Sequence, residues 1–71
     1  MTAVDIVFRF RATPTERQMQ ALDLLHEVYG VRKISVKEKE KTIRIEYDIS
    51  RLMPADVAAL VHGAGIEAQV E

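Results

Sequence analysis

The order in which two kinds of apolar periodicity follow each other constrains this fold more than any other feature. Residues 4–10 and 42–48 alternate apolar and polar side chains, which is the period of a strand with one buried face. Residues from about 14 to 29 and from 54 to about 62 have helical spacing, and each segment begins with a proline and is followed by a glycine. The sequence therefore predicts an α+β fold.

Two weaker strand patterns complete the order of elements. Residues 31 to about 39 alternate, and the charged run 38–41 suits a hairpin turn. Residues 66–70 alternate again. The predicted order is β-α-β-β-α-β, with residues 1–71 forming one domain. Right-handed crossovers then give a four-stranded antiparallel sheet with two helices on one face, the ferredoxin-like βαββαβ sandwich.

The core is expected from the inward faces of these elements. Phe8, Phe10 and Tyr47 are predicted to point inward from the strands. Each helix is expected to add one apolar stripe, and the two stripes consist of Ala21, Leu24, Leu25, Val28, Val57, Leu60 and Val61.

The predicted first helix begins with a capping signature. Thr13 is a favourable N-cap, Pro14 suits the first helical position, and Glu16 follows Thr13 by three residues. The Thr13 hydroxyl would accept from the Glu16 amide, and the Glu16 carboxylate would accept from the Thr13 amide.

Composition excludes several classes of function. The chain has no cysteine, so it has no disulfide, thiolate ligand or cysteine nucleophile. Its net charge of −1 gives no long-range attraction to nucleic acid or to an anionic membrane. No apolar run approaches the roughly 20 residues of a membrane span. The open sheet face carries no aromatic ring for base stacking. We expect a cytoplasmic protein that binds neither nucleic acid nor membrane.

Three stretches carry a family resemblance. Residues 30–36 form a Gly-Val turn into a strand, residues 42–48 form a strand ending in Tyr-Asp, and residues 64–68 read Ala-Gly-Ile-Glu-Ala. Together they resemble the scaffold of the heavy-metal-associated (HMA) domain, which occurs in copper chaperones, metal-transporting ATPases and mercury-binding proteins. The resemblance covers essentially the whole chain and implies the ferredoxin-like fold.

The HMA family binds metal through a Met-x-Cys-x-x-Cys loop. Counting back from Gly30 by the family's usual spacing places the two cysteine positions at Pro14 and Arg17, and the methionine position at Ala12. Proline offers no donor atom, and a guanidinium is a permanent cation that does not ligate metal. No metal or catalytic residue can be carried over from the family, and we expect no cofactor.

The remaining donors and nucleophiles form no chemical motif. His26 and His62 lie near the ends of the two predicted helices, where an imidazole complements the helix dipole. Both are expected to lie away from residues 12–17, which stand in place of the family's metal-binding loop and are called the replaced loop below. No histidine and carboxylate have a compact ligand spacing. Ser35 and Ser50 have no histidine close in sequence. We therefore expect the chain not to be an enzyme.

Three arginines form the first candidate binding surface. Arg9, Arg11 and Arg17 are predicted to gather near the replaced loop, at a helix N-terminus that favours anions. They either receive an acidic partner or a small anion, or are solvated side chains paired with Asp5 and Glu16.

The flank of the first helix is the second candidate surface. Met19, Leu22, His26 and Tyr29 lie beside the predicted core stripe. Either the second helix covers this flank, or the flank contacts a protein partner or a second copy of the chain. The second and fourth strands are also predicted to be sheet edges, which are open to pairing with another chain.

These observations favour a small, non-catalytic, HMA-like binding module without a thiol metal site, acting through protein–protein contacts or self-association. The alternative is a heavy-metal transport or chaperone-type protein whose metal is held by non-thiol or partner-supplied ligands. A third hypothesis is a regulatory domain for a small molecule, for which the sequence identifies no ligand.

Overall fold

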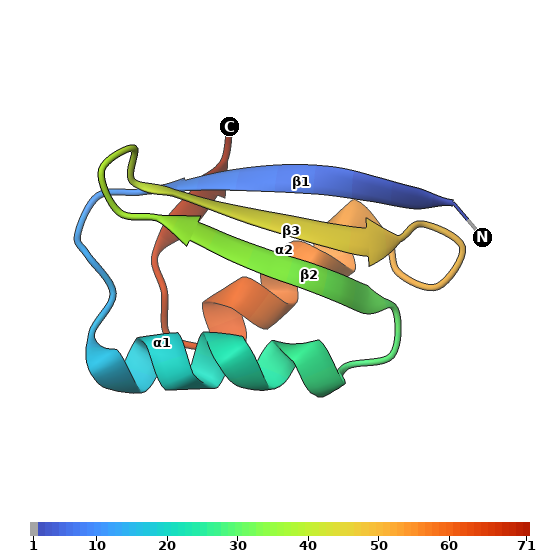
Figure 1. The fold of residues 1–71 in the computed structure, drawn as a ribbon, viewed down its shortest axis with the longest axis horizontal. Coiled ribbons are helices and arrows are strands. Elements are labelled where there is room, and N and C mark those ends of the chain that lie inside the picture. Colours follow the sequence, from blue (N-terminus) through green and yellow to red (C-terminus); the bar gives the residue numbers. More distant parts are fainter. Residues whose placement is uncertain (1) are drawn as a thin grey trace.

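The computed structural model describes residues 2–71 as one sheet with its helices on one side (Figure 1). The elements are, in order, β1 (Ala3–Phe10), α1 (Glu16–Asp23), the 3-10 turn η1 (Leu24–Glu27), β2 (Val31–Lys37), β3 (Thr42–Asp48), α2 (Pro54–Gly63) and β4 (Ala68–Val70). The predicted element order and ferredoxin-like fold class are confirmed. Within residues 2–71, no helix is long and apolar enough to cross a membrane.

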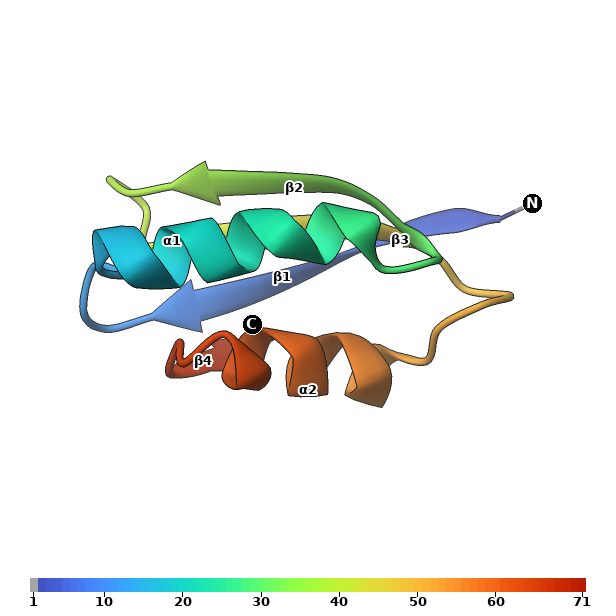
Figure 2. The same cartoon turned by 90° about the horizontal axis from the view of Figure 1, so that it is seen from below.

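The strands are ordered β2-β3-β1-β4, and each neighbouring pair is antiparallel. The central pair β1–β3 runs from Ala3 opposite Asp48 to Arg9 opposite Thr42. By contrast, β4 pairs only with Phe8–Phe10 of β1. Figure 2 shows α1 and α2 side by side on the same face of the sheet. The strands β2 and β4 are therefore the two edges, as the sequence predicted.

The strand side chains that point toward the helices form the core. Phe8 and Ile43 lie opposite each other in the central pair, and both are fully buried. Val57 and Val61 are one helical turn apart on α2 and are also fully buried. Each such burial contributes about 1.5–3 kcal/mol relative to an exposed side chain. The buried apolar residues are Ile6, Phe8, Phe10, Leu22, Ile43, Ile45, Tyr47, Val57, Val61, Ile66 and Ala68.

Two predicted strand boundaries were too long. β2 ends at Lys37 because residues 38–41 form the hairpin turn, which the Lys41 amide closes onto the Glu38 carbonyl at 3.2 Å. β4 begins at Ala68 rather than at residue 66 because its partner β1 ends at Phe10.

The predicted start of the first helix was also wrong. α1 begins at Glu16, and its N-cap is Thr15 instead of Thr13. The Thr15 hydroxyl accepts from the Gln18 amide at 3.2 Å, and the Gln18 side-chain oxygen accepts from the Thr15 amide at 2.8 Å. Pro14 precedes this capping box and is buried. Both possible boxes have the same spacing in sequence, so the choice between them depends on tertiary contacts.

The buried face of the first helix differs from the predicted stripe. Leu22 is only 1% exposed, whereas Leu24 is 63% exposed. Leu22 lies within α1, and Gln18, Leu22 and Leu25 are four and three residues apart, which is the spacing of one helix face. Leu24 follows Leu22 by two residues and therefore lies on the other side of the helix. Leu22 is a core residue, and its assignment to a partner surface was an error.

Asp48, the last residue of β3, is a buried carboxylate at the start of the turn that leads to α2. Its Oδ1 accepts from the Ser50 hydroxyl at 2.6 Å and from the Ser50 amide at 3.0 Å. These hydrogen bonds favour the charged carboxylate, the first of them most strongly, and hold the pKa of Asp48 below its ordinary value. The turn is therefore tied to the end of β3.

The position of Leu22 predicts unequal effects of two leucine truncations. Leu22→Ala removes a buried side chain and should lower the free energy of unfolding by about 2–5 kcal/mol. Leu24→Ala, its matched control two residues away, should change it by less than about 1 kcal/mol because Leu24 is exposed. Urea denaturation measures both values. A larger loss from Leu24→Ala than from Leu22→Ala would contradict this helix orientation.

Candidate functional site

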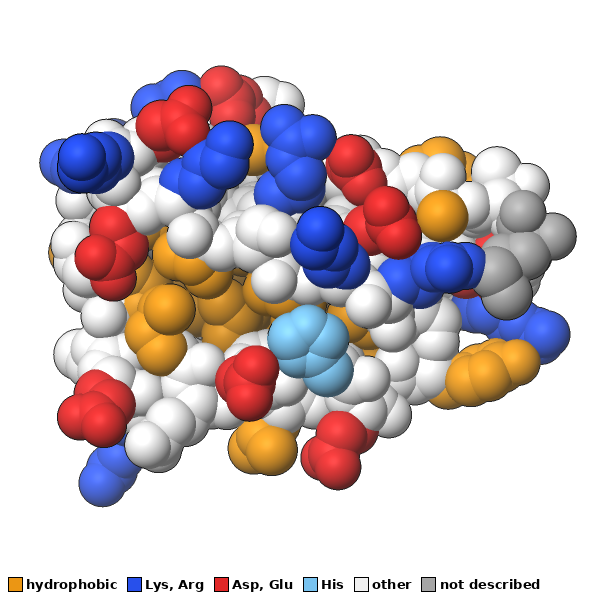
Figure 3. All heavy atoms as spheres, in the orientation of Figure 1, with side chains coloured by type: hydrophobic (Ala, Val, Ile, Leu, Met, Phe, Trp, Pro, Cys, Tyr) orange, Lys and Arg blue, Asp and Glu red, His pale blue; other side chains and the backbone are white. Residues whose placement is uncertain are grey.

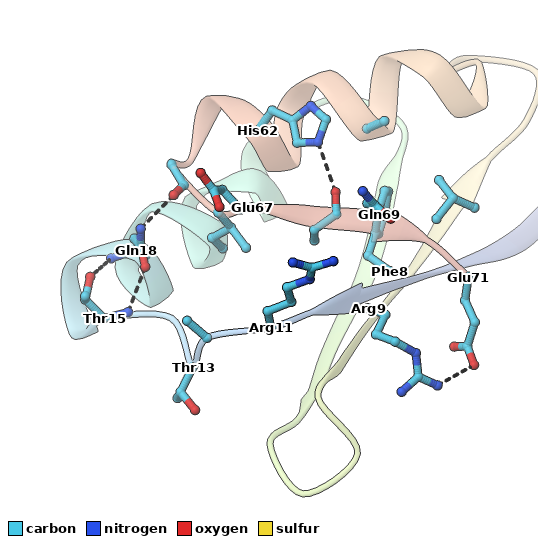
Figure 4. Close-up of a pocket in the computed structure, with 16 residues that line it drawn as sticks. Phe8, Arg9, Arg11, Thr13, Thr15, Gln18, His62, Glu67, Gln69 and Glu71 are labelled. Carbon is cyan, nitrogen blue, oxygen red and sulfur yellow. Dashed lines mark hydrogen bonds and ion pairs between the residues drawn. The ribbon is translucent and has the colours of Figure 1, made fainter.

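An open groove lies where β1 leads into α1 and where α2 leads into β4 (Figure 4). It has a volume of about 1360 Å³ and is open to solvent. In this antiparallel topology, β1 and α2 end on the same side of the molecule, so segments far apart in sequence meet there. The polar side chains that line the groove are Arg9, Arg11, Thr13, Thr15, Gln18, His62, Glu67, Gln69 and Glu71.

Gln18 connects the two sides of this groove. Its side-chain oxygen accepts from the Thr15 amide, while its side-chain nitrogen donates to the Gly65 carbonyl at 2.6 Å. Gly65 has a positive φ of +85°, which favours glycine in the turn between α2 and β4. Thr13 has no such second contact among the described residues. This bridge explains why the Thr15 capping box forms in preference to the predicted one.

The two histidines lie apart in the fold, and His62 lies beside the replaced loop, contrary to the expectation. His62 ends α2 beside the groove, and its Nε2 lies 3.1 Å from the Ala68 carbonyl oxygen. Since a carbonyl only accepts, Nε2 carries the proton and donates. His26 lies at the far end of the first helix, with its Nδ1 3.0 Å from the Asp23 carbonyl oxygen. The orientation of the second crossover makes His62 a groove residue.

The structure brings two of the three candidate arginines to the groove. Arg9 and Arg11 line it, whereas Arg17 is exposed on α1 and does not. Arg9 forms an ion pair of 2.9 Å with Glu71, and Asp5 pairs with Arg44 at 3.1 Å, so the alternative in which Arg9 pairs with Asp5 is wrong. Arg11 has no ion pair among the described residues. Of the three arginines, Arg11 is therefore the one that lies in the groove without an ion pair to another described residue.

The residues predicted on the helix flank do not form one surface. Leu22 is buried, Met19 is partly buried, and His26 is exposed. Tyr29 is 72% exposed, and the Arg51 guanidinium lies 4.8 Å from the centre of its ring. This cation–π contact places Tyr29 against the turn before α2. Because Leu22 is buried, the four residues do not form a continuous exposed surface on the helix.

The residues present do not fit a metal centre of the HMA type. The two positions at which the family resemblance places the cysteines hold buried Pro14 and exposed Arg17. Across residues 2–71, no group of three or more histidine, cysteine, aspartate or glutamate side chains is arranged to hold a metal ion. In the groove, His62 and Glu67 are potential donors from the α2 and β4 side.

Sequence reasoning overlooked Gln18, His62, Glu67, Gln69 and Glu71 as groove residues. The signal was present in the predicted topology, because a βαββαβ order already places the end of the second helix beside the first loop. No local motif marks these residues.

No protein-family model and no curated protein matches the sequence, whereas solved structures match the fold over nearly the whole chain. The Cu(I)-loaded first domain of the human copper chaperone for SOD1 has 21% identity and a TM-score of 0.78, with 100% of this chain and 96% of that chain covered. Oxidized MerP from Ralstonia metallidurans CH34 has 14% identity and a TM-score of 0.80, with 99% of both chains covered. The fold is that of an HMA domain. The N-terminal domain of PacS from Synechocystis PCC6803 has 17% identity and a TM-score of 0.72, with 96% and 97% covered.

The bridging role of Gln18 predicts a loss of stability on truncation. Gln18→Ala removes the hydrogen bonds to Thr15 and Gly65 and should lower the free energy of unfolding by about 1–2 kcal/mol. Gln20→Ala is the matched control, since Gln20 is an exposed glutamine on the same helix and should change stability by less than about 0.5 kcal/mol. Equal urea midpoints for the two variants would show that the bridge is energetically unimportant.

Proposed function

We propose that this chain is a small non-catalytic binding module that uses an HMA-type fold for protein–protein contact and has no thiol metal site. The groove where β1 meets α1 is the contact surface. Its partner is a protein segment in extended conformation, received along the exposed edge of β4.

The main support for this proposal is that the groove lies along an edge of the sheet. The outer side of β4 has no neighbouring strand in the sheet order, and residues 65–71 all line the groove. An unpaired edge offers backbone donors and acceptors at regular spacing, and an extended segment can satisfy them. Val70 is 59% exposed there and supplies an apolar contact.

The replaced loop supports the same function. The loop ends in a buried proline and a reciprocal capping box, and Gln18 fastens it to the Gly65 turn. It thus forms one wall of the groove without metal. Arg11, which has no ion pair among residues 2–71, is available for an acidic group of the partner.

A second candidate function is metal handling without thiols. It is favoured by the structural neighbours, which include a Cu(I)-loaded copper chaperone domain, and by the presence of His62 and Glu67 in the groove. In this case a partner would complete the ligand set, because among residues 2–71 no three such donors are arranged to hold a metal ion.

Position-specific photo-crosslinking tests the binding module. A benzophenone amino acid at position 69, in the groove, should give protein adducts in an extract of the cells that make this protein. The same amino acid at position 20, an exposed site on α1 outside the groove, should give several-fold fewer. Equal labelling at positions 69 and 20 would contradict a contact surface at the groove.

Metal titration separates the two candidate functions. The isolated chain should bind Cu(I) or Zn²⁺ no more tightly than about micromolar in competition with a chelator, because it lacks thiolates. Stoichiometric nanomolar binding that His62→Ala weakens would support metal handling instead. His26→Ala serves as control, since His26 lies away from the groove.

A further inference from the structure

The edge strand β4 exposes the backbone groups of two particular residues. Glu71 donates its amide to the Val7 carbonyl at 2.9 Å, so odd-numbered residues at β4 direct their backbone toward β1. Backbone groups alternate between the two sides of a strand, so those of Ala68 and Val70 face outward. The contact of the His62 ring with the Ala68 carbonyl, from outside the sheet, agrees with this assignment.

The opposite edge, β2, can be described in the same way. Phe10 donates its amide to the carbonyl of Lys41 at 2.9 Å, so odd-numbered residues along β3 face β1 and even-numbered ones face β2. The register pairs the even-numbered residues of β3 with odd-numbered residues of β2. The backbone groups of Ile34 and Val36 therefore face outward.

The two edges carry opposite charges on the open sheet face. The side chains of Lys33, Ser35 and Lys37 form a basic row on β2. Gln69 of β4 and the two residues that flank this short strand, Glu67 and Glu71, form an acidic row at the other edge. Both rows have the same two-residue spacing, with the charged residues at their ends.

One antiparallel register between a β2 edge and a β4 edge allows backbone hydrogen bonds and also places opposite charges next to each other. It sets Val36 of one copy opposite Ala68 of another, and Ile34 opposite Val70, so that outward-facing backbone groups meet. In this register the open-face pairs are Lys37 with Glu67, Ser35 with Gln69, and Lys33 with Glu71. Strand direction agrees, because β2 and β4 run in opposite directions in the sheet.

Pairing of identical edges is disfavoured by the same rows. Two β2 edges in the equivalent register would place Lys33 opposite Lys37, and two β4 edges would place Glu67 opposite Glu71. Like charges directly opposite each other destabilise a strand pair. The charge pattern therefore selects the mixed pairing.

Figure 3 shows a hollow between the β2 edge and α1 in which apolar side chains are visible. Ile34, Val36 and Leu25 are partly buried apolar residues that pack against the core. An incoming β4 strand would direct Val70 toward this helix-facing side, because Val70 lies opposite the inward-pointing Phe8 in the sheet. Its 59% exposed surface would then be covered.

We propose that the partner of the groove is a second copy of this chain, whose β2 strand pairs with β4 and continues the sheet. This inference rests on the proposed function and names its partner. In each pair of copies, one copy keeps a free β2 edge and the other keeps a free β4 edge, so the contact is heterologous and builds rows of copies with all helices on one face.

His62 restrains this assembly. Its ring occupies the outer side of the Ala68 carbonyl, which the β2 strand of the next copy would need as an acceptor. The existing pairs of Glu71 with Arg9 and of Lys37 with Glu40 are exposed and weak, so they can be exchanged for contacts between copies. His62→Ala should therefore lower the concentration needed for association by up to about tenfold.

Charge exchange between the two edges tests the proposal. Sedimentation velocity of the wild-type chain at low salt should show the average mass rising to at least twice 8.1 kDa by about 1 mM, and falling at about 0.5 M salt. The double variants Lys33→Glu/Lys37→Glu and Glu67→Lys/Glu71→Lys should each stay monomeric, since each has edges of one sign. An equimolar mixture of the two should associate again, because its edges are complementary; circular dichroism checks that both are folded.

Three outcomes would overturn this inference. They are a wild-type and a His62→Ala chain that are both monomeric at about 1 mM, double variants that associate like the wild type, or a mixture that fails to associate. If crosslinking at position 69 still captures a different protein in these cases, the proposed binding function stands and the partner assignment fails. If position 69 gives no adducts either, both fail.

Discussion

The antiparallel pairing of β1 with β3 is the constraint on which the rest of the structure depends. These two strands occupy the centre of the sheet, and their register sets Ile6 opposite Ile45 and Phe8 opposite Ile43. All four side chains are buried against the helices. Because side chains alternate along a strand, a shift by one residue would expose this entire set. The helices can pack on one face only because the central register keeps that face apolar.

The same topology assembles the groove from segments that are distant in sequence. The end of β1 and the end of α2 meet on one side of the molecule, and Gln18 joins them by its contact with the Gly65 carbonyl. The first loop, where the family resemblance places two cysteine positions, holds a buried proline and leads to an exposed arginine, and it is closed by hydrogen bonds. The loop is thus kept in place without metal, while the groove beside it remains open.

The charged side chains along the two sheet edges bear on what the groove can bind. A net charge of −1 conceals a separation of charge, with lysines along β2 and glutamates flanking β4. Exposed lysine on an edge strand usually hinders unwanted strand pairing. Against an edge that carries glutamate at matching spacing, the same lysines become attractive. Whether an edge is protected or receptive therefore depends on the charge of the strand that approaches it.

The sequence by itself determined the elements and most of the core. The strand at residues 42–48, the hairpin at 38–41 and the inward Phe8, Phe10 and Tyr47 follow from a period of two, which is a local property of the backbone. Tertiary structure decided which of two equivalent capping boxes forms, because only Gln18 reaches Gly65. It also decided that Leu22 is buried and Leu24 exposed, because the side of the first helix that faces the core depends on how the helix packs on the sheet. The location of His62 and the partner of Arg9 were likewise decided by contacts across the sheet, which no local spacing encodes.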